Sequence, residues 1–151
     1  MFLTYKDLSE LFPNSRGIRD INLPFHTISS FAEQNQPKGL FIPLSEESGE
    51  LGKAIENGAI GAIWEEGKEI PKYTPNHFPI FITNDIVKGF KEMTKQYMKK
   101  IKTSETKNMD MTKFLFLEEK LLNENFKTYD IAVVEENLSL YIEQLSEERR
   151  G

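Results

Sequence analysis

KGLFIPLSEESGELGKAIENGAIGAIWE, residues 38–65, is the stretch of sequence that predicts the fold. Its apolar run Gly39–Leu44 is short enough for a buried strand, and Ser45 follows as a residue suited to capping a helix. Apolar residues then recur at spacings of three and four, as on one face of a helix: Leu51, Ala54 and Ile55. Gly58 can end that helix, and the continuous apolar run Ala59–Trp64 is typical of a strand in a parallel sheet. This order predicts a right-handed βαβ unit.

Length and composition limit the fold and the partners of the chain. With 151 residues, one compact domain or one domain with a small annex is expected. The absence of cysteine excludes disulfides, thiolate zinc sites and a cysteine nucleophile. The net charge of -5 argues against binding to nucleic acid or an anionic membrane, since both require a surplus of Lys and Arg. We expect a cytoplasmic protein, because the sequence shows neither a targeting signal nor an apolar run long enough to span a bilayer.

Further elements are predicted on both sides of the βαβ unit. Thr4, with Asp7 three residues later, predicts a capped first helix, and residues 25–31 predict an edge strand. Pro79–Thr83 predicts another strand, after which the Asn84–Asp85 pair can cap a long helix. The apolar residues of that helix fall at spacings of three and four: Ile86, Phe90, Met93, Tyr97 and Ile101.

The polar segment Thr103–Asp110 predicts a boundary between a domain of residues 1–102 and an extension of residues 103–151. A helix is expected to follow this segment, with a strand at Tyr129–Val134 and a last helix capped by Asn137. The first of these helices would be apolar at Met111, Phe114, Leu115, Leu121 and Leu122, and the last at Leu138, Tyr141, Ile142 and Leu145. One strand cannot form a sheet alone, so this strand would join the sheet of the first domain or pair across a dimer.

Three segments resemble the N-terminal domain of the Mur ligase family: Pro37–Leu44, Ala54–Ile63 and Pro79–Asp85. The resemblance covers about residues 25–101 and is to the ligases that add the third amino acid or the D-alanyl-D-alanine dipeptide during peptidoglycan synthesis. It implies a small α/β domain, a two-layer or three-layer sandwich around a mostly parallel sheet. In the family this domain holds the UDP-muramyl end of the substrate, whereas separate domains bind ATP and the incoming amino acid.

The resemblance also implies where a ligand would bind. Before the Leu-Phe strand, the family carries a Thr-Asp-Ser-Arg-like turn that contacts the uridine nucleotide. The matching positions make Ser29, Ser30, Phe31 and Glu33 the candidate ligand-binding residues. Phe31 stands where the family has Asp, and Glu33 stands where it has Arg, so a carboxylate would repel the diphosphate.

The ATP site of the family would fall at Ile101–Asn108, where the chain has no glycine. A phosphate cradle needs glycines so that successive backbone N–H groups can converge on the oxygens. Lys107 could be a remnant of the phosphate-binding lysine, but an ordinary linker lysine is the favoured interpretation. The residues that remain are too few for the ligase catalytic domains, so we expect no catalytic residues and no cofactor.

Other candidate sites have a plainer structural explanation. His26 and His77 have no His or carboxylate partner at helical spacing, so no metal site is expected. Paired glutamates are typical of solvated helix faces, and Trp64 is expected to close the edge of the core rather than to stack on a ligand.

Two functions follow from the residues and the resemblance together. The first is a stand-alone, non-catalytic relative of the Mur ligase N-terminal domain that acts as a binding or regulatory module, through a protein partner or a homodimer, in connection with cell-wall synthesis. The alternative is a domain that binds a UDP-N-acetylmuramoyl peptide or another UDP-sugar and works with a separate ligase subunit. The inward or outward orientation of the Ser29–Glu33 turn separates them.

Overall fold

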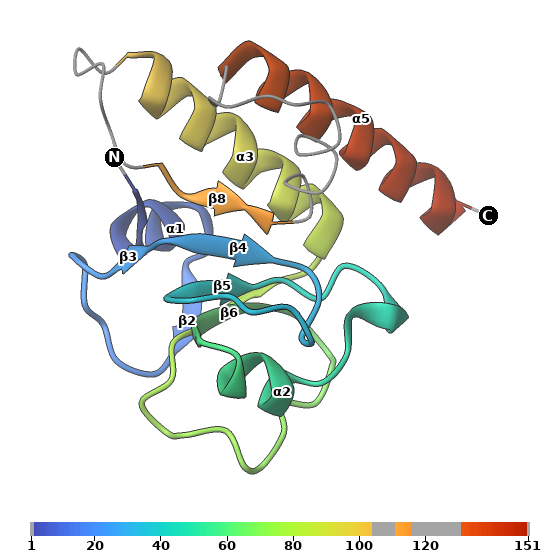
Figure 1. Ribbon diagram of the computed structural model, residues 1–151. Helices are drawn as coiled ribbons and strands as arrows, with labels where there is room; N and C mark the ends of the chain where they lie inside the picture. Colours follow the sequence, from blue (N-terminus) through green and yellow to red (C-terminus); the bar gives the residue numbers. More distant parts are fainter. Residues whose placement is uncertain (1, 104–110, 116–130, 151) are drawn as a thin grey trace.

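The computed structural model describes residues 2–103, 111–115 and 131–150, which form an α/β fold around a mixed six-stranded sheet (Figure 1). In their order across the sheet, the strands are β2 (Asn14–Arg16), β7 (Ile80–Thr83), β6 (Ala59–Glu65), β5 (Gly39–Phe41), β4 (Thr27–Ser29) and β8 (Lys113–Phe114). β2 runs antiparallel to β7, and every other neighbouring pair is parallel. The predicted α/β class with a mostly parallel sheet is therefore confirmed.

The predicted βαβ unit forms where the sequence places it. β5 and β6 are parallel neighbours, and a 3-10 helix, η1 (Glu46–Ser48), and α2 (Leu51–Glu56) lie between them in the chain. β5 ends at Phe41, earlier than expected, and α2 begins later than a cap at Ser45 predicts, because η1 takes up the first part of the connection. Gly58 turns the chain from α2 into β6 with φ +114°, a conformation that favours glycine.

Helices cover both faces of the sheet, so the fold has three layers (Figure 1). One face carries α1 (Tyr5–Leu11), α3 (Ile86–Lys102) and α5 (Ile131–Arg150), and the other carries α2. Side chains of the sheet alternate between the two cores: Leu40 and Ile63 face the three helices, whereas Phe41 and Ala62 face α2. Burial on both faces explains why these strands are apolar without polar alternation.

The long helix α3 forms as predicted. Asp85 is its N-cap, and the Asp85 side chain accepts a hydrogen bond of 3.1 Å from the backbone N–H of Lys88. The predicted apolar face is buried throughout: Ile86, Phe90, Met93, Tyr97 and Ile101. In the last turn, Lys100 forms an ion pair with Asp7 of α1, with 2.7 Å between Nζ and Oδ2, so the end of α3 is fastened to the start of α1.

The start of the chain confirms the capping box. Thr4 and Asp7 exchange hydrogen bonds between side chain and backbone at the start of α1. Before α1, the short strand β1 (Leu3–Thr4) pairs antiparallel with β3 (Pro24–Phe25) in a separate two-stranded ribbon. The strand β2, which the sequence did not predict, follows α1 and pairs with β7 at one edge of the main sheet.

A strand does form within residues 25–31, as predicted, but the prediction that it is an edge strand is wrong. β4 spans only Thr27–Ser29, and it is not an edge strand, because β5 lies on one side and β8 on the other. All three residues of β4 are buried. The missing polar alternation, which made the segment hard to assign, is the consequence of burial on both faces.

The C-terminal extension differs most from expectation. The helix expected after residue 110 is wrong at its start, because Lys113–Phe114 forms β8, paired in parallel with β4. The strand expected at Tyr129–Val134 is wrong from Ile131 onward, since α5 begins there and continues through Asn137, the predicted cap. Its apolar face is correct, because Leu138, Ile142 and Leu145 are buried against the same core as α3. Short apolar runs fit a strand or a buried helix equally well, which explains both errors.

Parts of the expected extension lie outside the described residues. These are the polar segment after Thr103 as far as Asp110, together with Leu121, Leu122, Tyr129 and Asp130. Within residues 2–103, 111–115 and 131–150, no helix is both long and apolar enough to cross a membrane. The described residues after 110 pack into the main core, since Phe114 and Leu138 belong to the same buried cluster as α1 and α3.

A buried polar network ties β8 to the N-terminal ribbon. The Thr112 hydroxyl donates to the Phe25 carbonyl oxygen at 2.6 Å and accepts from the Leu3 N–H at 2.8 Å. The Thr112 N–H in turn donates to the Tyr97 hydroxyl of α3 at 2.8 Å. Burial is the main cause that raises the pKa of Tyr97.

Candidate functional site

The four residues that the sequence singled out lie at the end of β4 and in the turn that follows it. This turn is at the topological switch point of the sheet: from β4 the chain continues to β5, β6 and β7 on one side, then returns through α3 to β8 on the other. Open α/β sheets bind ligands outside the carboxyl ends of their strands at such a point. The turn is therefore in the place where this class of fold most often holds a ligand.

The polar groups at the start of this turn bond to the turn itself. Ser29 is fully buried, and its hydroxyl lies 3.0 Å from the Phe31 carbonyl oxygen and 2.9 Å from Oε1 of Gln34. The same hydroxyl accepts a hydrogen bond of 3.1 Å from the Phe31 N–H. Ser29 thus holds the turn closed and offers no free hydroxyl at its surface.

Ser30 is also buried, and it faces α5 rather than a ligand cavity. It is 1% exposed, and its Oγ lies 3.4 Å from the hydroxyl of Tyr141. The Tyr141 ring meets Phe90 of α3 edge to face, with 6.2 Å between the ring centroids. The C-terminal helix therefore covers Ser30, a contact that sequence reasoning missed because it joins residues 111 positions apart.

A side chain of the same β4–β5 connection and one at the end of α2 brace the rest of the turn. The Gln36 Nε2 group donates to the carbonyl oxygens of Phe31 and Gln34, at 3.0 Å each. Asn57, at the end of α2, donates from its side chain to the Ala32 carbonyl oxygen at 2.8 Å. Together these bonds hold the backbone of the turn in one conformation.

Phe31 and Glu33 are the two candidate residues that face outward. The Phe31 side chain is 40% exposed, and Glu33 is exposed as well. The turn thus presents an aromatic ring and a carboxylate to solvent, while its hydroxyl groups point inward. The structure brings the four predicted residues close together, but the two serines face the interior and Phe31 and Glu33 face solvent.

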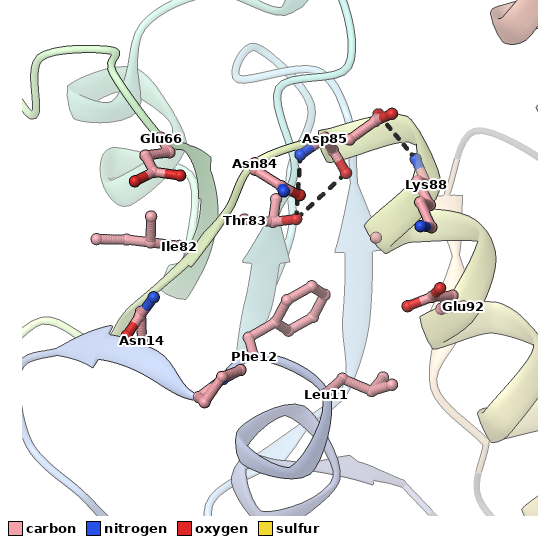
Figure 2. Close-up of a pocket in the computed structure, with 12 residues that line it drawn as sticks. Leu11, Phe12, Asn14, Glu66, Ile82, Thr83, Asn84, Asp85, Lys88 and Glu92 are labelled. Carbon is pink, nitrogen blue, oxygen red and sulfur yellow. Dashed lines mark hydrogen bonds between the residues drawn. The ribbon is translucent and has the colours of Figure 1, made fainter.

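A second site, which the sequence did not predict, is a hollow of about 250 Å³ at the carboxyl end of β7 (Figure 2). The end of α1, the chain that leads to β2 and the first turns of α3 surround it. Its lining residues are Leu11, Phe12, Pro13, Asn14, Glu66, Ile82, Thr83, Asn84, Asp85, Lys88, Gly89 and Glu92. Only the capping role of Asn84–Asp85 was visible in the sequence, because the other walls come from distant segments.

The hollow lies beside the N-terminus of α3, a position that favours anions when its N–H groups are free. In this protein, carboxylates of Glu65 and Asp85 already accept hydrogen bonds from two of the N–H groups at this helix end. The Ile86 N–H donates to Oε2 of Glu65 at 3.2 Å, and the Lys88 N–H donates to Oδ1 of Asp85 at 3.1 Å. Glu66 and Glu92 add negative charge to the lining. A phosphate would therefore meet several carboxylates in this hollow, with Lys88 as the one cationic side chain of the lining.

The remaining predicted residues take structural positions. His26 stacks on Phe2, with 4.1 Å between the rings, and His77 is exposed. Within the described part of the chain, no group of three or more His, Cys, Asp or Glu side chains could hold a metal ion. Trp64 packs partly buried against the α2 core, as expected. Lys107, the candidate remnant of a phosphate-binding loop, lies outside the described residues.

No protein-family model matches this chain, and no curated protein matches it significantly.

Proposed function

We propose that this chain is a non-catalytic relative of the Mur ligase N-terminal domain and acts as an interaction module in connection with peptidoglycan synthesis. The turn after β4 carries this proposal. At the position where the family contacts uridine, the Ser29 hydroxyl is engaged inside the turn and Phe31 is exposed in its place. A surface of this kind suits a protein partner better than a nucleotide.

Uridine binding would require the turn to break its own hydrogen bonds. A buried group that loses its partner costs about 1–3 kcal/mol, and the Ser29 hydroxyl and the Phe31 N–H are both involved. Glu33 adds an exposed carboxylate, which can accept hydrogen bonds but cannot donate them to a phosphate. Both effects oppose a UDP-sugar at this position.

An exposed aromatic ring on a rigid turn has the properties of an interface anchor. Aromatic residues are enriched among the side chains that dominate binding energy, and a side chain held by a fixed backbone loses little entropy on binding. The bonds from Gln36 and Asn57 give the Phe31 turn that fixed backbone. The expected partner is a peptidoglycan ligase of the type that the sequence resembles.

The test measures binding of purified Mur ligases, of the types that add the third amino acid or the D-alanyl-D-alanine dipeptide, to the immobilised protein. Phe31→Ser should weaken binding at least about 10-fold, because a central aromatic anchor contributes about 2 kcal/mol or more. Ile18→Ser is the matched control, since Ile18 is 54% exposed in a different loop and its loss should leave binding unchanged. Absence of binding to both ligases would refute the proposal.

The alternative function, binding of a UDP-N-acetylmuramoyl peptide, is supported by the location of the turn at the switch point of the sheet. NMR titration with UDP-N-acetylmuramoyl tripeptide separates the two. Saturating shifts of the Ser29 and Ser30 amides at micromolar ligand would establish the alternative and overturn the interaction module. Unchanged spectra are expected.

A further inference from the structure

α3 carries a row of lysines along the side that faces away from the sheet. Its four members are exposed and fall at spacings of three and four: Lys88, Lys91, Lys95 and Lys99. Within the described residues, none of the four side chains forms an ion pair. Glu92 is the one acidic residue of the helix. Like charges at this spacing repel one another, and Glu92 offsets only part of this repulsion, since it lies four residues after Lys88 and three before Lys95.

α5 carries the opposite charge on its outer side. Glu136, Glu143 and Glu147 are exposed and separated by two turns and one turn of helix, so they share one face. Leu140 lies on the same face and is 55% exposed. The opposite side of α5 carries the buried Leu138, Ile142 and Leu145. α5 thus presents an acidic row with an exposed apolar side chain in its middle.

The two rows lie on neighbouring helices. α3 and α5 pack against each other on the same face of the sheet, as Figure 1 shows in yellow and red, and Phe90 and Tyr141 touch between them. Each helix buries its apolar side in the shared core, so its charged row lies on the opposite, solvent-exposed side. One surface of the molecule therefore combines a basic row and an acidic row side by side.

We propose that this outer face of α3 and α5 is self-complementary and joins two copies of the chain about a two-fold axis. A two-fold axis makes each partner use the same surface, so the face must match itself. When α3 of one copy lies on α5 of the other, each lysine row meets a glutamate row, and this happens twice in the dimer. The exposed Leu140 of each copy then lies against the aliphatic stems of the lysine row on the other copy.

A second copy matches this face better than a nucleic acid or an anionic membrane. The acidic row lies directly beside the basic row, and the chain has a net charge of -5, so a polyanion would be repelled by part of the surface it contacts. Only a partner with both signs of charge in the same arrangement satisfies both rows. The proposal uses residues distinct from the Phe31 turn, so it stands or fails independently of the proposed function.

The size of the face predicts a weak dimer. Helices of this length extend about 25–30 Å and are about 10 Å wide, so the pair offers about 500–600 Å² to a partner. Stable interfaces bury about 800 Å² on each side, and exposed charge pairs are screened by salt. We therefore expect association at micromolar or higher protein concentration that weakens at least 10-fold between about 50 mM and about 500 mM NaCl.

The decisive experiment exchanges the charges of the two rows. One variant carries Lys91→Glu, Lys95→Glu and Lys99→Glu, and the other carries Glu136→Lys, Glu143→Lys and Glu147→Lys. In sedimentation velocity at low salt, each variant alone should be monomeric, because both rows then have the same sign. An equimolar mixture should form a heterodimer, because every acidic row again meets a basic row.

Controls separate this interface from general charge and folding effects. Lys38→Glu, Lys68→Glu and Lys72→Glu make the same change in net charge at exposed positions outside α3 and α5, and should leave the dimer intact. Circular dichroism confirms that each variant is folded. A wild-type protein that stays monomeric at low salt, or a mixture that does not associate, would overturn the proposal. Lysine-dependent binding of a polythymidine oligonucleotide or of phosphatidylglycerol vesicles by a monomeric wild type would also overturn it.

Discussion

Thr112→Val should show that one buried hydroxyl holds β8 and the N-terminal ribbon together. The Thr112 side chain bridges the Leu3 N–H and the Phe25 carbonyl oxygen, at 2.8 Å and 2.6 Å. Valine has nearly the same shape but no hydroxyl, so both backbone groups lose this partner. Leu3 and Phe25 are 2% and 0% exposed, which leaves little room for water to replace it.

The expected loss follows from the cost of unsatisfied groups. Each buried backbone group without a partner costs about 1–3 kcal/mol, so Thr112→Val, which affects two groups, should lower the free energy of unfolding by about 2–6 kcal/mol. That is a large part of the 5–15 kcal/mol typical of small proteins. Thr112→Ser keeps the hydroxyl and removes one methyl group, and should cost only about 1 kcal/mol.

Urea unfolding at equilibrium measures the difference. Trp64 is the single tryptophan, and its partly buried position in the α2 core makes its fluorescence a suitable probe. With a typical slope of about 1–3 kcal/mol per molar urea, the valine variant should unfold at a midpoint about 1 M below that of the serine variant. A valine variant as stable as the serine variant would refute the bridging role.

Two further predictions concern pH and backbone conformation. Because burial raises the pKa of Tyr97 above 10.0, unfolded chains release this proton before folded ones do, so stability should fall as pH rises above about 10. In Tyr97→Phe this part of the alkaline slope should disappear from urea midpoints measured between about pH 9 and 11. Gly58→Ala should destabilise the fold more than Gly67→Ala in the same assay: both glycines have positive φ, but only a Cβ at Gly58 meets the Gln36 carbonyl oxygen, at 2.7 Å, whereas Gly67 has nothing within 4 Å. Equal losses would show that backbone conformation alone decides the cost.

The candidate site was partly predictable because its residues are consecutive. The positions Ser29–Glu33 follow a strand, and consecutive residues after a strand necessarily share one turn. Which side chains face inward was not predictable. The hydrogen bonds that hold the backbone of the turn come from the side chains of Gln36 and Asn57, and Tyr141 of α5 packs over Ser30. The hollow beside α3 was missed for the same reason, since its walls meet only after folding.

Local signals determined the elements whose stabilising contacts are close in sequence. The capping box at Thr4, the Asp85 cap and the apolar spacing of α3 each depend on residues three or four positions apart, and all are present in the structure. The βαβ unit was predictable from its two apolar runs and from Gly58 between them, whereas Ser45 caps η1 and not α2, whose N-cap is Glu50.

Tertiary contacts decided the identity of the segments near the C-terminus. Lys113–Phe114 forms a strand at the edge that β4 offers, and residues 131–150 form one helix whose Leu138 and Ile142 pack into the same core as α3. A sheet edge and a helix-lined core surface are built from residues far away in the sequence. The sequence alone therefore determined the type and order of the main strands and helices of residues 37–102, while only the folded molecule decided which partner each ambiguous apolar run would pack against.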